Sequence, residues 1–196
     1  MKRHAEAAAL YNNVALLHTK SDATISKPQI NFSKENGFTE LVIKYPKVKN
    51  KLPIISKLLK IKRYKQYYKH GLGLLKSVGF YPDLVHCNVM NPVGLIAKFW
   101  KKQLKIPYVI TEHWTGFLSS DGRYSQSRAL KFSLPKIANS AEKILPVSSD
   151  LKNALIQNNL GNNFEIVHNV VNTEKFYPQK KTKNKFLVVA DLENVQ

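Results

Sequence analysis

The sequence predicts an α/β fold in which a parallel sheet is covered by helices on both faces. Short β-rich runs alternate with helical segments of about a dozen residues along most of the chain, as in βαβ units. Several of these runs end in polar residues, as strands do where they face a ligand crevice. The chain of 196 residues, 43% of them apolar, is long enough for one or two domains with a sizeable core.

Six runs are expected to be strands because they are rich in β-branched and aromatic residues and are bounded by turn signals. In order, they are residues 14–17, 40–45, 82–88, the run that begins at Ile106, residues 143–148 and residues 164–168. Asn88, the pair Glu112 and His113, and Ser148 stand at the ends of three of them. These polar residues are therefore the first candidates for a site.

Four segments are expected to contain helices. Residues 1–10 have an amphipathic pattern, and residues 44–76 include a long apolar stripe at helical spacing. Residues 92–104 begin with a proline suited to a first helical turn. Residues 151–158 follow Ser148, Ser149 and Asp150, any of which can cap a helix start.

Several familiar motifs are incomplete or absent. Gly71 and Gly73 imitate part of a dinucleotide fingerprint, but the third glycine is missing and no strand precedes them, so we expect them to end or loosen a helix. No Walker loop or nucleophile elbow is present. His86, His113 and His168 lack metal-ligand spacing, so no metal is expected.

Composition limits the class of protein. The single cysteine, Cys87, excludes an internal disulfide and a cysteine-based zinc cage, and its strand context predicts a small core residue. No apolar run approaches the roughly 18 to 20 residues that span a bilayer. The N-terminus lacks a signal-peptide pattern. We therefore expect a cytoplasmic protein.

Positive charge is concentrated in one segment. The chain has 31 Lys and Arg against 13 Asp and Glu, a net charge of +18, and residues 44–76 contain ten lysines, one arginine and no acidic residue. Their apolar stripe is Ile54, Leu58, Ile61, Tyr64, Tyr68, Leu72 and Leu75. A basic amphipathic helix of this kind can lie on an anionic membrane. The residues expected to face that membrane are Lys57, Lys60, Lys62, Arg63, Lys65 and Lys69.

Two alternatives for this basic segment stay open. It fits an ordinary solvated helix face in a lysine-rich protein. Nucleic acid is the other anionic partner, since Tyr64, Tyr67 and Tyr68 lie between lysines and tyrosines stack on bases. No nucleic-acid-binding motif accompanies the charge, so a nucleic-acid partner is not expected.

Four segments occur in the order and at the spacing seen in bacterial family 4 glycosyltransferases, and the chain resembles this family over nearly its whole length. They are Asp83-Leu-Val-His86, residues 106–113, residues 141–148 and residues 168–178. The most specific is Asn169-Val-Val-Asn172-Thr-x-x-Phe176-x-Pro178, which is similar to the family's Asn-Gly-Val-Asp-x-x-x-Phe-x-Pro. Val170 replaces the usual glycine and Asn172 the usual aspartate, with the spacing kept.

The resemblance implies a GT-B architecture, in which two Rossmann-like domains face a cleft and bind the acceptor and a nucleotide sugar. Transfer in the family retains the anomeric configuration and needs no metal or other cofactor. His113 would be the catalytic residue, hydrogen-bonding the transferred sugar or its leaving group. Glu112 would orient it or line the acceptor site. Trp114, Asn88, Ser148 and Asn169 would complete the substrate-binding residues, although Asn88 stands where relatives often carry a second histidine.

Each of these roles has a structural alternative. His113 can be a satisfied structural histidine, and Glu112 can cap a helix or form an ion pair. Trp114 and Phe117 can pack under the next loop instead of stacking on a sugar or an apolar acceptor. Ser148 suits a helix cap. Asn169 can fix the turn into a linker through backbone hydrogen bonds.

The resemblance also implies a domain division. Residues 1–178 would be an acceptor domain without the first strand and glycine loop of relatives. Residues 179–196 would be a linker and, at residues 185–191, the first strand of a missing donor domain. The groups that hold the nucleotide sugar would then be absent, so the isolated chain is expected to be inactive.

The expected function is that of the acceptor side of a glycosyltransferase that transfers a sugar from a nucleotide donor to a lipid-linked or cell-envelope glycan. The parent enzyme would be cytoplasmic, and its basic segment would allow peripheral binding at the inner face of the membrane. The alternatives are a non-catalytic basic binding module and a fragment of another GT-B enzyme, such as a nucleotide-sugar epimerase.

Overall fold

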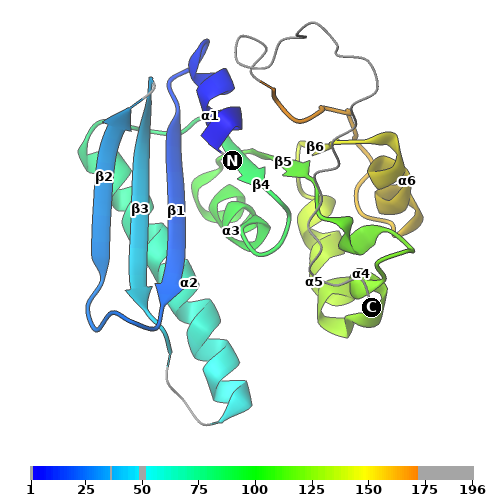
Figure 1. The fold of residues 1–196 in the computed structure, drawn as a ribbon, viewed down its shortest axis with the longest axis horizontal. Coiled ribbons are helices and arrows are strands. Elements are labelled where there is room, and N and C mark those ends of the chain that lie inside the picture. Colours follow the sequence, from blue (N-terminus) through cyan, green and yellow to red (C-terminus); the bar gives the residue numbers. More distant parts are fainter. Residues whose placement is uncertain (1, 36, 49–51, 172–196) are drawn as a thin grey trace, which may run out of the picture.

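The computed structural model describes residues 2–35, 37–48 and 52–171, and it confirms the α/β class. The described strands form two sheets of three strands each. In Figure 1 one sheet stands beside the long helix α2, and the other lies among the helices that follow it in the chain. The predicted strand at residues 185–191 lies outside the described residues.

The first sheet has the order β1-β3-β2 and comprises β1 (Ala15–Asp22), β2 (Gln29–Glu35) and β3 (Phe38–Pro46). β1 is parallel to β3, and β2 is antiparallel to it. The strands predicted at residues 14–17 and 40–45 are confirmed as β1 and β3. β2 was not predicted, although its alternation of Ile30 and Phe32 with polar residues is typical of a strand with one face exposed.

The second sheet is parallel throughout, with the order β4-β5-β6. It comprises β4 (Val85–Asn88), β5 (Tyr108–Glu112) and β6 (Lys143–Pro146), so the three strands predicted here are confirmed. Contrary to prediction, residues 164–168 do not form a full strand. They share one isolated bridge with β6, between Phe164 and Ile144, and the N–H groups of Glu165 and Val167 donate to the carbonyls of Ile144 and Pro146. The parallel register places the carboxyl ends of all three strands on one edge.

The helices occupy most of the predicted positions. They are α1 (Lys2–Ala9), α2 (Pro53–Ser77), α3 (Gly94–Leu104), α4 (Arg123–Gln126), α5 (Arg128–Ala138) and α6 (Ser149–Gln157), with a 3-10 turn η1 (Thr115–Phe117). α1, α2, α3 and α6 confirm the prediction, and α4 and α5 were not predicted. Among the described helices, none is long and apolar enough to cross a membrane.

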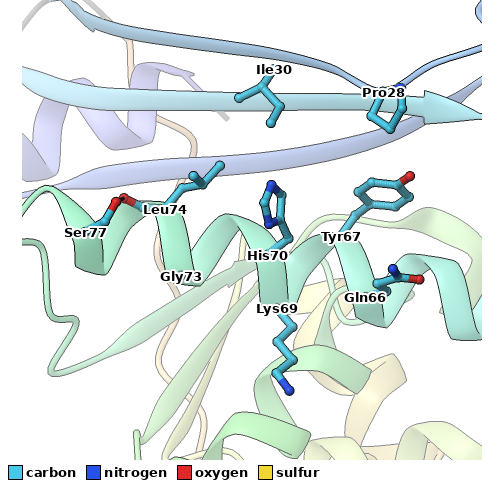
Figure 2. Close-up of a pocket in the computed structure, with 9 residues that line it drawn as sticks. All are labelled: Pro28, Ile30, Gln66, Tyr67, Lys69, His70, Gly73, Leu74 and Ser77. Carbon is cyan, nitrogen blue, oxygen red and sulfur yellow. Dashed lines mark hydrogen bonds between the residues drawn. The ribbon is translucent and has the colours of Figure 1, made fainter.

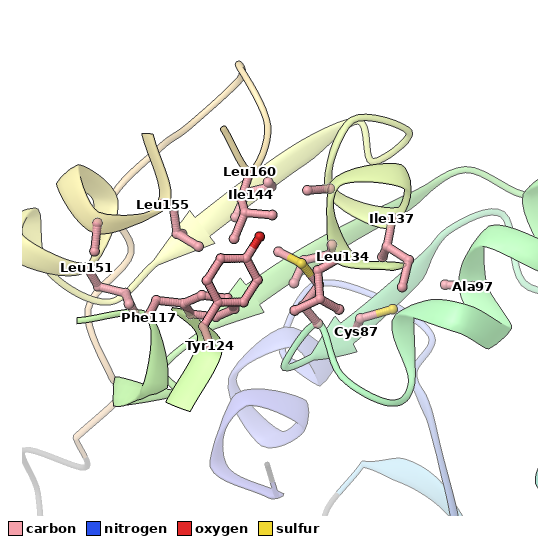
Figure 3. Packing of buried hydrophobic residues seen from close by; sticks show 14 of the residues in the cluster. Cys87, Ala97, Phe117, Tyr124, Leu134, Ile137, Ile144, Leu151, Leu155 and Leu160 are labelled. Carbon is pink, nitrogen blue, oxygen red and sulfur yellow. The ribbon is translucent and has the colours of Figure 1, made fainter. Parts of the chain in front are cut away.

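Buried side chains hold the two sheets to a common set of helices. The largest cluster surrounds the second sheet and includes Cys87, Ile110 and Ile144, which confirms Cys87 as a core residue (Figure 3). A second cluster of Tyr68, Leu72, Ile96 and Trp100 joins α2 to α3. Leu17 from β1 and Val85 from β4 both pack against this second cluster. The helix pair therefore connects the two sheets.

Gly71 sets the distance between α2 and the first sheet. A Cβ at this position would lie 2.5 Å from Cδ1 of Leu17 and 3.2 Å from Cδ1 of Ile43. α2 continues through both glycines to Ser77, so the prediction that they end or loosen a helix is wrong. Gly71 is needed for close packing, whereas a Cβ at Gly73 would meet nothing within 4 Å.

Candidate functional site

The carboxyl edge of the second sheet brings together three of the predicted residues. Asn88 ends β4, Glu112 ends β5, and His113 follows directly. Asn88 pairs with Thr111 in the parallel register, one residue before Glu112. Ligands of open α/β sheets bind outside the carboxyl ends of the strands, so these residues lie where a ligand is expected.

Glu112 is a buried carboxylate whose two oxygens accept three backbone hydrogen bonds. Oε2 accepts from the N–H of Met90 at 2.8 Å, and Oε1 accepts from the N–H groups of His113 and Trp114, each at 2.9 Å. Only 1% of the residue is exposed. The carboxylate thus ties the loop after β4 to the turn after β5.

The environment of Glu112 has opposing effects on its pKa. Burial raises the pKa of the carboxyl, while the N–H groups of Trp114, Met90 and His113 lower it by stabilising the charged form. Burial has the larger effect, and the pKa is raised overall.

His113 is exposed and contacts Asn88 across the strand ends. Its Nε2 lies 2.8 Å from Oδ1 of Asn88. An amide oxygen only accepts, so Nε2 carries the proton in this bond and Nδ1 keeps a free lone pair when the ring is neutral. Desolvation, with a smaller contribution from His4, lowers the pKa of His113. The lowered pKa favours the neutral ring, whose Nδ1 can accept a hydrogen bond.

The loop after β4 is held in an unusual conformation. Val89 has a φ of 72°, in the left-handed region, where a β-branched residue is strained. Its N–H donates to the carbonyl of Thr111 at 2.9 Å, and the next N–H is the one bound by Glu112. Strained backbone of this kind is common at functional sites, where the surrounding contacts enforce it.

Trp114 and Phe117 pack against each other, as the structural alternative predicted. Their rings meet edge to face with centroids 4.9 Å apart. The guanidinium of Arg123 lies 5.3 Å from the centre of the Trp114 ring and is itself paired with Asp121 at 2.6 Å. Phe117 is buried and Trp114 is half-buried, so only Trp114 retains surface for a ligand.

Ser148 and Asn169 lie beyond the end of β6. Ser148 caps α6, because its Oγ accepts from the N–H of Leu151 at 3.2 Å. Asn169 is exposed and follows His168, whose Nδ1 lies 3.0 Å from the carbonyl oxygen of Val147. Both follow β6 in the chain, and neither forms a hydrogen bond with Asn88, Glu112 or His113 in the described part of the structure.

Sequence reasoning missed the contributions of His86 and Met90. His86 lies two residues before Asn88, and its Nε2 is 2.6 Å from Oγ1 of Thr111. The period of two along a strand places His86 and Asn88 on one face, and this signal was available. Met90 contributes a backbone N–H from a position 22 residues before Glu112, and no local pattern reveals such a contact.

No three His, Cys, Asp or Glu side chains come together as a metal site within residues 2–35, 37–48 and 52–171. A groove of about 630 Å³ lies elsewhere, between α2 and the β2 side of the first sheet. Figure 2 shows Tyr67, His70 and Leu74 pointing from α2 toward Pro28 and Ile30. The strand-end site itself is built by polar contacts among Asn88, Glu112 and His113.

Comparison with known proteins decides the family. Residues 34–175 match Glycosyltransferase Family 4, and this segment contains all of the strand-end residues described above. The chain belongs to Glycosyltransferase Family 4. The β4-β5-β6 sheet with its helices accordingly fits a Rossmann-like half of the GT-B architecture.

A relative supports this assignment. The chain is 29% identical over 148 residues to an uncharacterized glycosyltransferase of Methanocaldococcus jannaschii. The aligned part covers 74% of the present chain and 37% of the relative. The chain thus spans little more than a third of the length of this relative.

Proposed function

We propose that residues 1–178 are the acceptor-side domain of a longer, retaining, bacterial-type glycosyltransferase. The enzyme transfers a sugar from a nucleotide-sugar donor to a lipid-linked or cell-envelope glycan. Residues 179–196 are the linker and the first strand of its donor domain. Support comes from the family match and from the relative, which is much longer than the aligned segment.

The observation that carries this proposal is the bond between His113 and Asn88. With Nε2–H engaged by Asn88, a neutral His113 offers Nδ1 as an acceptor at the carboxyl edge of the sheet. A sugar hydroxyl is a suitable donor to this atom, whereas a phosphate oxygen requires a donor. We therefore assign His113 to a hydroxyl of the transferred sugar in preference to its leaving group.

Glu112 positions this histidine without touching the substrate, since its oxygens are bound to Met90, His113 and Trp114. The exposed part of Trp114 stacks on a sugar ring or an apolar acceptor. Ser148 and Asn169 line the far side of the same edge. The isolated chain is inactive in this proposal, because transition-state stabilisation also needs groups of the donor domain.

The enzyme is proposed to act at the inner face of a membrane through the basic segment of α2. Lys57, Lys60, Lys62 and Lys69 are exposed, which supports this role. The side chains of Arg63 and Lys65 contact other parts of the protein. Arg63 donates to the carbonyl of Pro46 at 3.0 Å, and Nζ of Lys65 lies 5.9 Å from the centre of the Phe99 ring.

The test measures the rate at which the longer protein that includes this chain consumes a nucleotide-sugar donor. His113→Ala is expected to lower kcat by about 10² to 10³, the loss typical for one hydrogen bond that stabilises a transition state. His70→Ala, an exposed histidine on α2, is the matched control and should leave turnover unchanged. Wild-type turnover in His113→Ala would reject the role of His113. No turnover in the unsubstituted longer protein would favour a non-catalytic basic binding module.

A further inference from the structure

The apolar stripe of α2 divides into two halves with different surroundings. Tyr68, Leu72 and Leu75, in the second half, are buried against the sheet and α3. In the first half, Ile54 is 77% exposed and Leu58 is 63% exposed. The side chains of one apolar stripe are therefore part of the core at one end of the helix and are exposed to solvent at the other.

The exposed half carries several uncovered apolar side chains. Ile55, Leu59 and Ile61 are exposed beside Ile54 and Leu58, so five large aliphatic side chains lie uncovered within eight residues. Figure 1 shows this cyan end of α2 extending past the strands at the lower edge of the molecule. Soluble domains seldom leave a contiguous apolar patch uncovered unless it is an interaction site.

The charge around this patch has one sign. Lys57, Lys60 and Lys62 alternate with the five aliphatic residues and are exposed, and residues 44–76 contain no acidic residue. A second copy of the same patch would bring lysines against lysines. Nucleic acid would pair with the lysines but would leave the aliphatic side chains in water. An anionic lipid surface satisfies both sets of side chains.

We propose that the first turns of α2, residues 53–62, insert into the surface of an anionic phospholipid bilayer. Ile54, Leu58 and Ile61 enter the boundary between headgroups and acyl chains, while the three lysines contact lipid phosphates. This inference rests on the membrane contact proposed above and states how that contact is made. It does not depend on glycosyl transfer.

The test uses the full chain and vesicles of phosphatidylcholine alone or with 30% phosphatidylglycerol, without any glycan. Co-sedimentation with the anionic vesicles is expected at low salt and should weaken at 0.5 M salt, because the lysine contacts are screened. Ile54→Ser with Leu58→Ser should lower the partition coefficient at least tenfold at low salt, because two buried aliphatic side chains are lost. Lys57→Gln, Lys60→Gln and Lys62→Gln together should also lower it and flatten the salt dependence.

A matched control is available on α5. Phe132 is 70% exposed, and Nζ of Lys136 lies 3.6 Å from the centre of its ring. Phe132→Ser with Lys136→Gln removes similar chemistry from another surface and should leave vesicle binding unchanged. Because all substituted side chains are exposed, each variant should keep the thermal midpoint of the parent chain.

Three results would overturn the inference. If the serine variant binds as tightly as the parent and the glutamine variant does not, the contact is purely electrostatic and nothing inserts. If no protein binds the anionic vesicles, the membrane contact itself is wrong, and turnover by the longer enzyme remains a separate question. If the parent self-associates in solution and the serine variant is monomeric, the patch is an interface between copies of the chain.

Discussion

The backbone N–H of Met90 donates to Oε2 of Glu112 at 2.8 Å and so fixes the loop after β4 to the end of β5. The other carboxylate oxygen holds the two residues that follow Glu112. One side chain thereby sets the relative positions of Asn88 and His113, which come from different strands. The geometry of the site consequently depends on a residue that is almost wholly buried.

Glu112→Gln should destabilise the chain by about 1–3 kcal/mol, the cost of leaving a buried donor without an acceptor. The amide keeps one oxygen but turns an NH₂ group toward the N–H groups, so at least one donor loses its partner. Chemical denaturation measures the change. Glu142→Gln is the matched control, because the exposed ion pair of Glu142 with Lys101 contributes about 1 kcal/mol or less. Equal effects of the two substitutions would contradict the role given to Glu112.

Asn88→Asp should raise the pKa of His113, measured by NMR titration of the ring protons. In the parent chain desolvation and His4 lower this pKa, and a carboxylate at position 88 would favour the charged ring. The lowered pKa also makes the stability of the parent chain depend on pH. The neutral His113 ring stabilises the fold fully above the unfolded-state pKa of about 6.5, and this stabilisation is lost as the pH falls through the lower pKa of the folded state.

Asn88→Ala distinguishes the effect of a new negative charge at position 88 from the effect of losing the hydrogen bond to His113. This substitution removes the oxygen that accepts from Nε2 of His113 and adds no charge. The pKa of His113 should therefore not rise as it does in Asn88→Asp. If Ala and Asp shift the pKa of His113 equally, the side chains do not interact as the 2.8 Å contact indicates.

The thiol of Cys87 should be inert in the folded chain, because burial raises its pKa to about 12. At pH 8 only about one thiol in ten thousand would then be ionised, and the thiolate is the reactive form. Iodoacetamide labelling followed by mass spectrometry should show little modification under native conditions and rapid modification in denaturant. Rapid native labelling would mean that the core around β4 opens readily.

Two glycines of α2 should respond to alanine in opposite directions. Gly73→Ala should stabilise the chain by about 0.5–1 kcal/mol through helix propensity, since the new Cβ meets nothing within 4 Å. Gly71→Ala should destabilise it by about 1–3 kcal/mol through overpacking against Leu17. Thermal unfolding of the pair measures both effects. Stabilisation by both substitutions would show that β1 and α2 separate easily.

Local patterns predicted most of the elements, and the errors have physical causes. In β2, Ile30 and Phe32 alternate with polar residues, and the Asn36-Gly37 dipeptide follows directly. This dipeptide is a strong hairpin signal from which the strand could have been predicted. α5 contains Pro135, which argues against a helix in sequence. Residues 164–168 have strand composition, and the N–H groups of Glu165 and Val167 donate to carbonyls of β6, but only one isolated bridge, between Phe164 and Ile144, forms.

The site was predictable only in part. Strand ends identified Asn88, Glu112 and His113, because parallel strands bring their carboxyl ends to one edge. The sequence does not reveal the direction in which Glu112 points, since its partner Met90 is 22 residues away. The sequence also does not reveal that Ile54 and Leu58 are exposed, because an apolar stripe has the same pattern whether or not another element covers it.

α2 is a single helix of 25 residues without an internal proline after its first position, and at a rise of about 1.5 Å per residue it is about 37 Å long. One end is anchored among Tyr68, Leu72, Ile96 and Trp100, and the other is free of the sheets. A tilt of the exposed end would be passed along the helix to the buried end, and because Val85 at the start of β4 packs on that end, the strand that carries Asn88 would be displaced as well.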